Sequence, residues 1–306
     1  MKITVANPIY DSVFKFLMED ERISKTVLSA LLKKEVLSVE MRRHEHPNVV
    51  RDNLSMFRID FAARVRESDG SIRLVLIELQ KTWLDTETLR FRRYLAAQYN
   101  AEENMQKEGS QKGYALPMIA VYLLGHRVGN IEEPVIYVGH KALDYEGKEV
   151  ANGMTDPFIN SLIHDSIIVQ IPLLHGKINN RLDKVLSVFD QSQRDQSYQQ
   201  VICLDGEKYE DDAEMMYILH RLGLAMMNAE LRQEMNDEDE YYSAIEARDT
   251  QVMRQNKIIS EQSAQISEQS AQIKAMAKAM LGNGVSIEVI AQTINKSVDD
   301  VRALLD

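Results

Sequence analysis

The spacing of apolar residues changes twice along the first half of the chain. Apolar residues from Val13 to Leu32 recur three and four apart, which predicts a helix with Asp11 as its N-cap. Residues 56–65 and 72–80 form two apolar runs separated by Asp69-Gly70, a signal for a hairpin of two strands. Helical spacing returns over residues 89–106. Further apolar runs predict strands at 116–124, 135–139 and 166–174.

This order of elements predicts an α/β fold in which helices flank a mixed central sheet. From Arg181 onward the pattern becomes helical. We therefore expect an α-helical C-terminal region after the sheet.

Two acidic residues interrupt the predicted hairpin. Asp60 lies in its first strand, and Glu78 and Gln80 fall on one face of the second because side chains alternate along a strand. A facing Asp60 could share a Mg²⁺ ion with Glu78, and a metal-bound water is the nucleophile of many hydrolases. Alternatively, both acids face solvent on the polar side of an antiparallel sheet. The apolar run 74–77 favours a buried carboxylate, which needs a cation partner.

A heptad pattern marks the later part of the chain. The segment Ser260–Ile266 is repeated residue for residue as Ser267–Ile273. This pattern predicts a coiled-coil helix that forms a homo-oligomer through residues 250–280, although the second core position of most heptads is polar. A lone spacer helix is the alternative. The residues at the sevenfold spacing are Val252, Ile259, Ile266, Ile273 and Met280.

Residues 281–306 predict a small helix-turn-helix-like unit. Ser286 and Ser297 are the expected N-caps, and Asp300 occupies the capping-box position after Ser297. Such a unit either reads DNA or serves assembly and regulation. The acidic final helix favours assembly or regulation.

The net charge of −11 is unevenly distributed. Residues 1–100 hold 17 Lys and Arg against 14 Asp and Glu, whereas the remaining residues hold 19 against 33. We interpret the acidic stretch from Asp205 to Asp249 as a solvated helix face or connector. The basic residues therefore gather around Asp60 and Glu78, and nucleic-acid affinity depends on such local charge.

Several classes of protein are disfavoured by the sequence. The single cysteine, Cys203, provides no intrachain disulfide framework. The absence of a leader and of a long apolar stretch predicts a cytoplasmic protein with no membrane partner. No glycine-rich phosphate loop indicates a nucleotide cofactor.

The motifs, taken in order, resemble a known family. They are Asp11-Ser12-Val13-Phe14-Lys15, Asp60, Glu78-Leu79-Gln80, Arg90 with Tyr94, and the strand from Pro117 to Leu124. Over residues 1–190 the chain resembles the recombination-promoting nuclease and transposase-like branch of the PD-(D/E)XK superfamily. The ordered set, rather than any single motif, carries this resemblance. It implies a restriction-endonuclease-like sheet and a metal-dependent DNA endonuclease.

The resemblance also implies roles for residues of the hairpin. Asp60, Glu78 and the Leu79 carbonyl would hold Mg²⁺ or Mn²⁺, with Asp60, Glu78 and Gln80 as the catalytic set. Gln80 stands where the superfamily usually has Lys, although the branch resembled here commonly carries Gln. An amide can orient the attacking water but has no amine to accept its proton.

Other motif residues are candidates for contact with DNA. Arg90 and Arg93 could hold a phosphate, and Tyr94 could stack or hydrogen-bond beside it. Asp11 and Lys15 either line the site or serve as ordinary N-cap and surface residues of their helix.

We expect four parts: a nuclease-like domain at 1–190, an acidic helical region at 191–249, the coiled-coil helix at 250–280 and the small unit at 281–306. The preferred function is an endonuclease that promotes recombination or acts on mobile or invading DNA. The alternative is a non-catalytic nuclease fold that serves as a DNA-binding or oligomeric scaffold.

Overall fold

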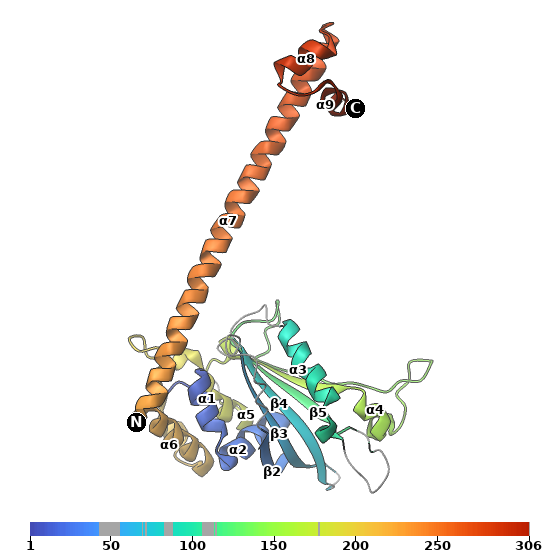
Figure 1. Ribbon diagram of the computed structural model, residues 1–306. Helices are drawn as coiled ribbons and strands as arrows, with labels where there is room; N and C mark the ends of the chain where they lie inside the picture. Colours follow the sequence, from blue (N-terminus) through green and yellow to red (C-terminus); the bar gives the residue numbers. More distant parts are fainter. Residues whose placement is uncertain are drawn as a thin grey trace. The chain divides into compact units, whose positions relative to one another are not determined.

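The computed structural model describes residues 1–42, 56–68, 70, 72–82, 88–105, 113, 115–176 and 178–305. The chain forms two compact units, Met1–Tyr241 and Tyr242–Asp306. Helix α7 contributes to both units (Figure 1). The helices are α1 (Asp11–Met18), α2 (Glu21–Leu32), α3 (Thr88–Asn100), α4 (Pro157–Ser161), α5 (Arg181–Leu186), α6 (Ala213–Met227), α7 (Ala229–Gly282), α8 (Ile287–Thr293) and α9 (Val298–Leu305).

A mixed six-stranded sheet lies at the centre of the first unit, so the expectation of an α/β fold is confirmed at that level. Its strand order is β2-β3-β4-β5-β7-β6. The pairs β2/β3, β3/β4 and β6/β7 are antiparallel, whereas β4/β5 and β5/β7 are parallel. The strands are β1 (Lys2–Ala6), β2 (Glu35–Arg42), β3 (Met56–Arg66), β4 (Ile72–Thr82), β5 (Met118–Leu124), β6 (Val135–Val138), β7 (His164–Gln170) and β8 (Val201–Asp205).

Every strand expected from an apolar run is present, with small changes at the ends. The last expected strand stops at Gln170, and residues Ile171–Leu173 form a 3₁₀ turn. Pro172 lies in this turn, and a proline has no backbone N–H for a strand ladder. The apolar pattern did not predict β1, β2 or β8.

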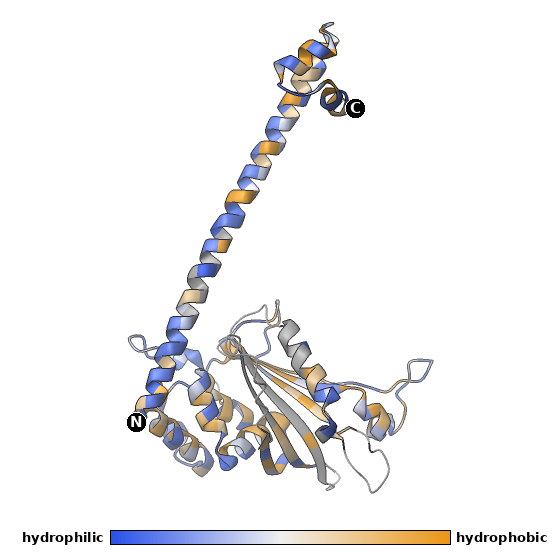
Figure 2. Ribbon diagram, viewed as in Figure 1, coloured by the Kyte–Doolittle hydropathy of each residue, from blue (hydrophilic) through white to orange (hydrophobic). Residues whose placement is uncertain are grey.

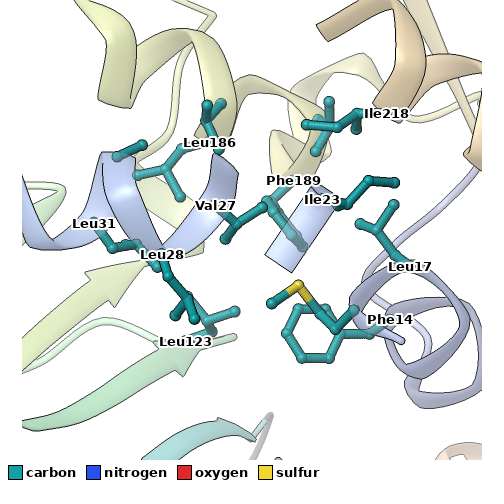
Figure 3. Packing of buried hydrophobic residues seen from close by; sticks show 14 of the residues in the cluster. Phe14, Leu17, Ile23, Val27, Leu28, Leu31, Leu123, Leu186, Phe189 and Ile218 are labelled. Atoms are coloured by element: carbon teal, nitrogen blue, oxygen red, sulfur yellow. The ribbon is translucent and has the colours of Figure 1, made fainter. Parts of the chain in front are cut away.

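Helices α1 and α2 cover one face of the sheet. Figure 3 shows Phe14 of α1 and Leu28 of α2 packed with Leu123 of β5 and with Phe189. The Phe14 and Phe189 ring centroids lie 6.0 Å apart in an edge-on contact. Burial of this apolar surface is the main source of stability for the first unit.

The expected single helix from Asp11 to Leu32 is two helices. The helical conformation is interrupted at Glu19-Asp20. The Asp20 side chain caps α2 by accepting a hydrogen bond of 3.1 Å from the Ile23 N–H. The predicted N-cap was also wrong, because Tyr10 holds that position and Asp11 is the first helical residue.

Helix α3 covers the opposite face of the sheet (Figure 1). Its buried Leu95 packs against Met118 and Ala120 of β5, with Tyr122 at the margin. Helices therefore cover both faces of the sheet. The sheet residues that contact α3 show which side chains lie on its face.

The first unit extends beyond the expected boundary at residue 190. Strand β8 pairs antiparallel with β1 at the start of the chain, for example Thr4 with Cys203. Helix α6 buries Met215, Ile218 and Leu222 in the same core as α1 and α2. Residues 191–241 thus complete the first unit because its N-terminal strand has its partner there.

The second unit encloses a small apolar core at its C-terminal end. Ala277 of α7, Ile290 and Ala291 of α8 and Val301 of α9 are almost fully buried there. Asn295, with a positive φ of 55°, turns the chain between α8 and α9. A helix-turn-helix-like arrangement was expected for these residues.

The two predicted caps in this unit differ. Ser297 forms the expected capping box: its Oγ accepts from the Asp300 N–H at 3.1 Å, and its own N–H donates to Asp300 Oδ2 at 3.3 Å. Ser286 occupies the N-cap position of α8, but its side chain accepts no capping hydrogen bond. In neither unit does a helix within the described residues have the length and apolarity needed to cross a membrane.

Candidate functional site

The register of β3 and β4 places the two candidate acids opposite each other. Asp60 pairs with Glu78, and Glu78 pairs on its other side with Ala120 of β5. Directly opposed positions of an antiparallel pair have Cβ atoms about 5 Å apart and share a face. The backbone therefore brings two carboxylate positions within reach of one cation. The side chains of Asp60, Glu78, Leu79 and Gln80 lie outside the described residues.

These positions belong to the face of the sheet that α3 covers. Gln80 pairs with Tyr122, and Glu78 pairs with Ala120, whose neighbours on that face pack against Leu95 of α3. Residues at the next positions of β4 and β5, such as Val75 and Val121, belong to the core on the α1 and α2 side. Asp60, Glu78 and Gln80 therefore share the α3 face.

The length of the turn between β3 and β4 decides this arrangement. Arg66 pairs with Ile72, so residues 67–71 connect the strands. A two-residue turn at Asp69-Gly70 would instead pair Asp60 with Leu79 and place Glu78 on the opposite face, because side chains alternate. Gly70 adopts φ 83°, and its N–H donates to the Glu67 carbonyl at 3.0 Å. The longer turn thus aligns the two acids.

Two residues beside the acids were not identified from the sequence. Ala120 of β5 is fully buried and pairs directly with Glu78. Ser166 of β7 pairs with Ala120 and is half-buried. Parallel pairing of β4, β5 and β7 creates this row, and neither residue carries a distinctive sequence signal.

Basic positions flank the two acids on the α3 face. Arg42 of β2 pairs with Asp60, and Arg58 of β3 pairs with Gln80. Arg64, two positions beyond Ala62 on the same face, has an exposed side chain. Arg58, Asp60 and Arg64 are separated by even numbers of residues along β3, so the sequence already indicated that they share one face of the strand. These cations would favour a phosphate-bearing ligand over a neutral one.

Helix α3 carries Arg90, Tyr94 and Gln98 at a spacing of four. These residues were expected on one helix face, and Gln98 is 4% exposed. Gln98 accepts a hydrogen bond of 2.8 Å from Asn104. Gln98 is therefore turned toward the protein. The side chains of Arg90, Arg93 and Tyr94 lie outside the described residues.

Asp11 and Lys15 belong to a different part of the unit. Helix α1 packs through Val13 and Phe14 into the core on the face opposite α3. Asp11 is 9% exposed, and its N–H donates to Glu238 of α7 at 2.7 Å, whereas Lys15 is exposed. The helix that carries them thus covers the face away from the Asp60 and Glu78 positions.

One residue of the acidic stretch, Glu238, is buried and structural. Glu238 is 3% exposed and accepts hydrogen bonds from the Ser12 N–H at 3.0 Å and the Ser12 hydroxyl at 2.9 Å, as well as from Asp11. It caps the N-terminus of α1, where the helix dipole favours an anion. The expectation of a solvated connector was wrong at this residue.

A neighbouring contact strengthens the attachment of α7 to α1. The Tyr10 hydroxyl donates to Asp239 at 2.7 Å. Burial, with the bond to Asp239, raises the pKa of the Tyr10 phenol, so it remains a neutral donor.

A second polar contact joins α3 to β7. The Tyr99 hydroxyl lies 2.7 Å from His164 Nδ1. Burial lowers the pKa of His164, and His140 lowers it further. A neutral imidazole accepts a hydrogen bond from the Tyr99 hydroxyl, so this bond holds the C-terminal end of α3 on the sheet at neutral pH.

The chemistry available at the site depends on the Asp60 and Glu78 positions. Among the residues whose side chains the structure describes, no three His, Cys, Asp or Glu side chains gather to hold a metal ion. The opposed carboxylate positions fit a hard cation that binds oxygen and retains several waters.

Comparison of this chain with protein-family models, with curated proteins and with solved structures found no match.

Proposed function

We propose that the protein is a divalent-metal-dependent DNA endonuclease of the PD-(D/E)XK type, from the recombination-promoting branch. The pairing of Asp60 with Glu78, two residues before Gln80, is the observation that supports this proposal most strongly. The flanking register positions of Arg42 and Arg58 favour a phosphodiester substrate.

The order of elements gives further support. Helix α2 precedes three antiparallel strands, β2 to β4, and α3 then leads to β5, which is parallel to β4. This order is compatible with a restriction-endonuclease-like sheet, as the sequence motifs suggested.

In the proposed mechanism, Asp60, Glu78 and the Leu79 carbonyl would hold Mg²⁺ or Mn²⁺. The bound cation would lower the pKa of a water ligand and neutralise charge on the scissile phosphate. Gln80 orients the attacking water through its amide. Arg42 and Arg58 hold the phosphate backbone beside it, and Arg90, Arg93 and Tyr94 on α3 extend the contact.

Plasmid cleavage by the purified protein tests the proposal. We expect supercoiled DNA to be cut in Mg²⁺ or Mn²⁺ and to remain intact with a chelator. Asp60→Ala and Glu78→Ala should each lower the rate at least about 100-fold, because each removes a ligand of the cation. Cleavage that survives both substitutions would exclude these residues from the mechanism.

Glu35→Ala is the matched control. Glu35 is an exposed carboxylate of the same sheet that pairs with Arg66, six residues along β3 from Asp60. Its loss removes only a surface ion pair, whose contribution to stability is about 0–1 kcal/mol. We expect its cleavage rate to equal that of the wild type.

A non-catalytic scaffold is the second candidate, and Gln80 is the observation that favours it, because an amide accepts no proton from the attacking water. Gln80→Lys separates the two functions. If the site is catalytic, the amine should raise the cleavage rate. Metal-independent DNA binding without cleavage by either protein would establish the scaffold.

A further inference from the structure

Helix α7 carries an exposed apolar stripe, which we define as Val252, Ile259, Ile266 and Ile273. The first three side chains are 46%, 58% and 65% exposed, and Ile273 is half-buried. Figure 2 shows the isolated apolar bands that interrupt the hydrophilic surface of this helix. Within the described part of the second unit, no side chain covers the first three residues of the stripe.

The charged residues of the same segment avoid this stripe. With the stripe at heptad position a, every charged residue between Val252 and Met280 falls at b, c or f, the outward positions of a coiled coil. A helix surrounded by water has no reason to exclude charge from positions a, d, e and g. A helix whose stripe is buried does, because an unpaired buried charge is costly. The charged residues are Arg254, Lys257, Glu261, Glu268, Lys274 and Lys278.

The chain itself covers only the end of this surface. Ala277, at position e, is fully buried against Ile290 and Val301, and Met280 packs at the edge of the same cluster. The uncovered stripe therefore runs from Val252 to Ile273, about 33 Å at the rise of an α-helix.

We propose that this stripe binds the same stripe of another copy of the chain, parallel and in register. In a parallel coiled coil, position a packs on a, and d packs on d. Isoleucine then meets isoleucine, whereas the glutamines at position d meet one another and can exchange amide hydrogen bonds. An antiparallel pair would place isoleucine against glutamine. The glutamines are Gln255, Gln262 and Gln269.

The flanking positions favour a second copy of the same chain. In the heptads between Val252 and Ile273, positions e and g carry no charge, so like chains do not repel one another across the interface. The polar d layers weaken the association, and a shift by one heptad would leave the apolar residue at one end of each stripe without a partner.

One consequence rests on the proposed nuclease function. Parallel pairing brings the N-terminal ends of two α7 helices together, and each α7 begins within a copy of the first unit. An assembly with two cleavage sites would be able to cut both strands of one duplex. The association itself does not depend on cleavage.

Sedimentation of the full chain tests the association. We expect the wild type to sediment as a whole multiple of 35.1 kDa, at least twice that mass. Ile259→Lys with Ile266→Lys should give a monomer with unchanged helical circular dichroism, because both side chains are already exposed in one chain. A monomeric wild type, or an assembly that the two lysines leave intact, would overturn the proposal.

Ser260→Lys with Ser267→Lys is the matched control. It adds the same two charges to the same helix one residue further on, at position b. We expect it to remain assembled. Equal dissociation of the control would show that added charge alone disrupts the assembly and would refute the role of the stripe.

The direction of pairing is tested by a single new cysteine. In a Cys203→Ser background, Gln255→Cys places the only thiol near one end of the stripe. A parallel pair brings the two thiols together, so mild oxidation should yield a covalent dimer. An antiparallel pair separates them along the stripe. Oxidation that yields no covalent dimer in an assembled sample would overturn the parallel arrangement.

Cleavage products distinguish this inference from the proposed function. If both hold, the wild type should convert supercoiled plasmid to linear DNA, and the Ile259→Lys, Ile266→Lys protein should mainly nick it. If the wild type cleaves nothing, the proposed function fails while the sedimentation result stands. Equal yields of linear DNA from assembled and monomeric proteins would refute the coupling of assembly to double-strand cleavage.

Discussion

Helix α2 and the stripe of α7 have similar apolar residues at helical spacing but different surroundings. Val27 and Leu28 of α2 are 3% and 0% exposed, whereas Ile259 and Ile266 of α7 are 58% and 65% exposed. Helix α2 packs between the sheet and helices α5 and α6, whose residues contact it in the same core (Figure 3). The stripe has no such cover from the described residues of its own unit.

The difference teaches how to interpret an apolar face. Periodicity identifies the side of a helix that avoids water, but not the partner that covers it. For α2 the partner is the rest of the first unit. For α7 we propose that it is another chain. Substitutions in the two units should therefore have very different effects on one chain.

The largest effect should come from the covered core. Phe14→Ala removes a fully buried ring that packs on Phe189, and should lower the free energy of unfolding of the first unit by about 3–5 kcal/mol. Denaturant titration measures this change. Phe158→Ala is the matched control because Phe158 is 55% exposed. A similar loss in both variants would contradict the assigned core.

The next effect should come from the buried cap of α1. Glu238→Gln removes a charged acceptor of three hydrogen bonds, which should cost about 1.5–3 kcal/mol. Unfolding of Glu240→Gln, an exposed neighbour, should match the wild type. If both variants unfold alike, the acidic stretch is solvated after all.

The capping box should make a smaller contribution in the second unit. Ser297→Ala should destabilise α9 by about 1 kcal/mol, because it removes the side-chain acceptor for the Asp300 N–H. Hydrogen exchange of α9 amides in the full chain measures the change. Ser286→Ala, which removes no capping bond, should have less effect on α8. Equal acceleration in both helices would refute the assignment of the caps.

A pH-dependent effect should appear at the Arg22–Glu214 ion pair. The hydrogen bond from Arg22 lowers the pKa of Glu214 below its ordinary value of 4.5. The pair therefore contributes stability above that value and loses it as pH falls through the lowered pKa. Because both side chains are partly exposed, Glu214→Gln should cost less than about 1 kcal/mol at pH 7 and nothing at low pH. A cost that persists in acid would point to another cause.

The smallest effect should come from the stripe in a single chain. In the Ile259→Lys background, Ile266→Ala should change the free energy of unfolding by less than about 0.5 kcal/mol, because the side chain contacts mainly water. The same substitution in the wild type should weaken self-association in sedimentation. A large loss of stability in the monomer would mean that the chain covers its own stripe.

The sequence was sufficient where a local rule decided the outcome. Apolar runs located β3, β4, β5, β6 and β7, and in the central strand β5 such a run reflects burial on both faces of the sheet. Helical spacing located α3, although the helix ends at Asn100 and not at residue 106, and the Ser297 capping box followed from residues three apart. The sequence did not predict β8, because its partner β1 is distant in the sequence, at the start of the chain.

For the candidate site, the sequence determined the residue types, and the tertiary structure decided which of them meet. Asp60, Glu78 and Gln80 were identified from their strands, but the two-residue turn at Asp69-Gly70 would shift the register by one residue and place the acids on opposite faces of the sheet. Likewise, the sequence made Asp11 a plausible member of the site, but the structure places α1 on the opposite face of the sheet. Strand alternation and helix periodicity are local properties. The pairing register of strands, and the face of the sheet that a helix covers, are not local properties, because residues distant in the sequence determine them.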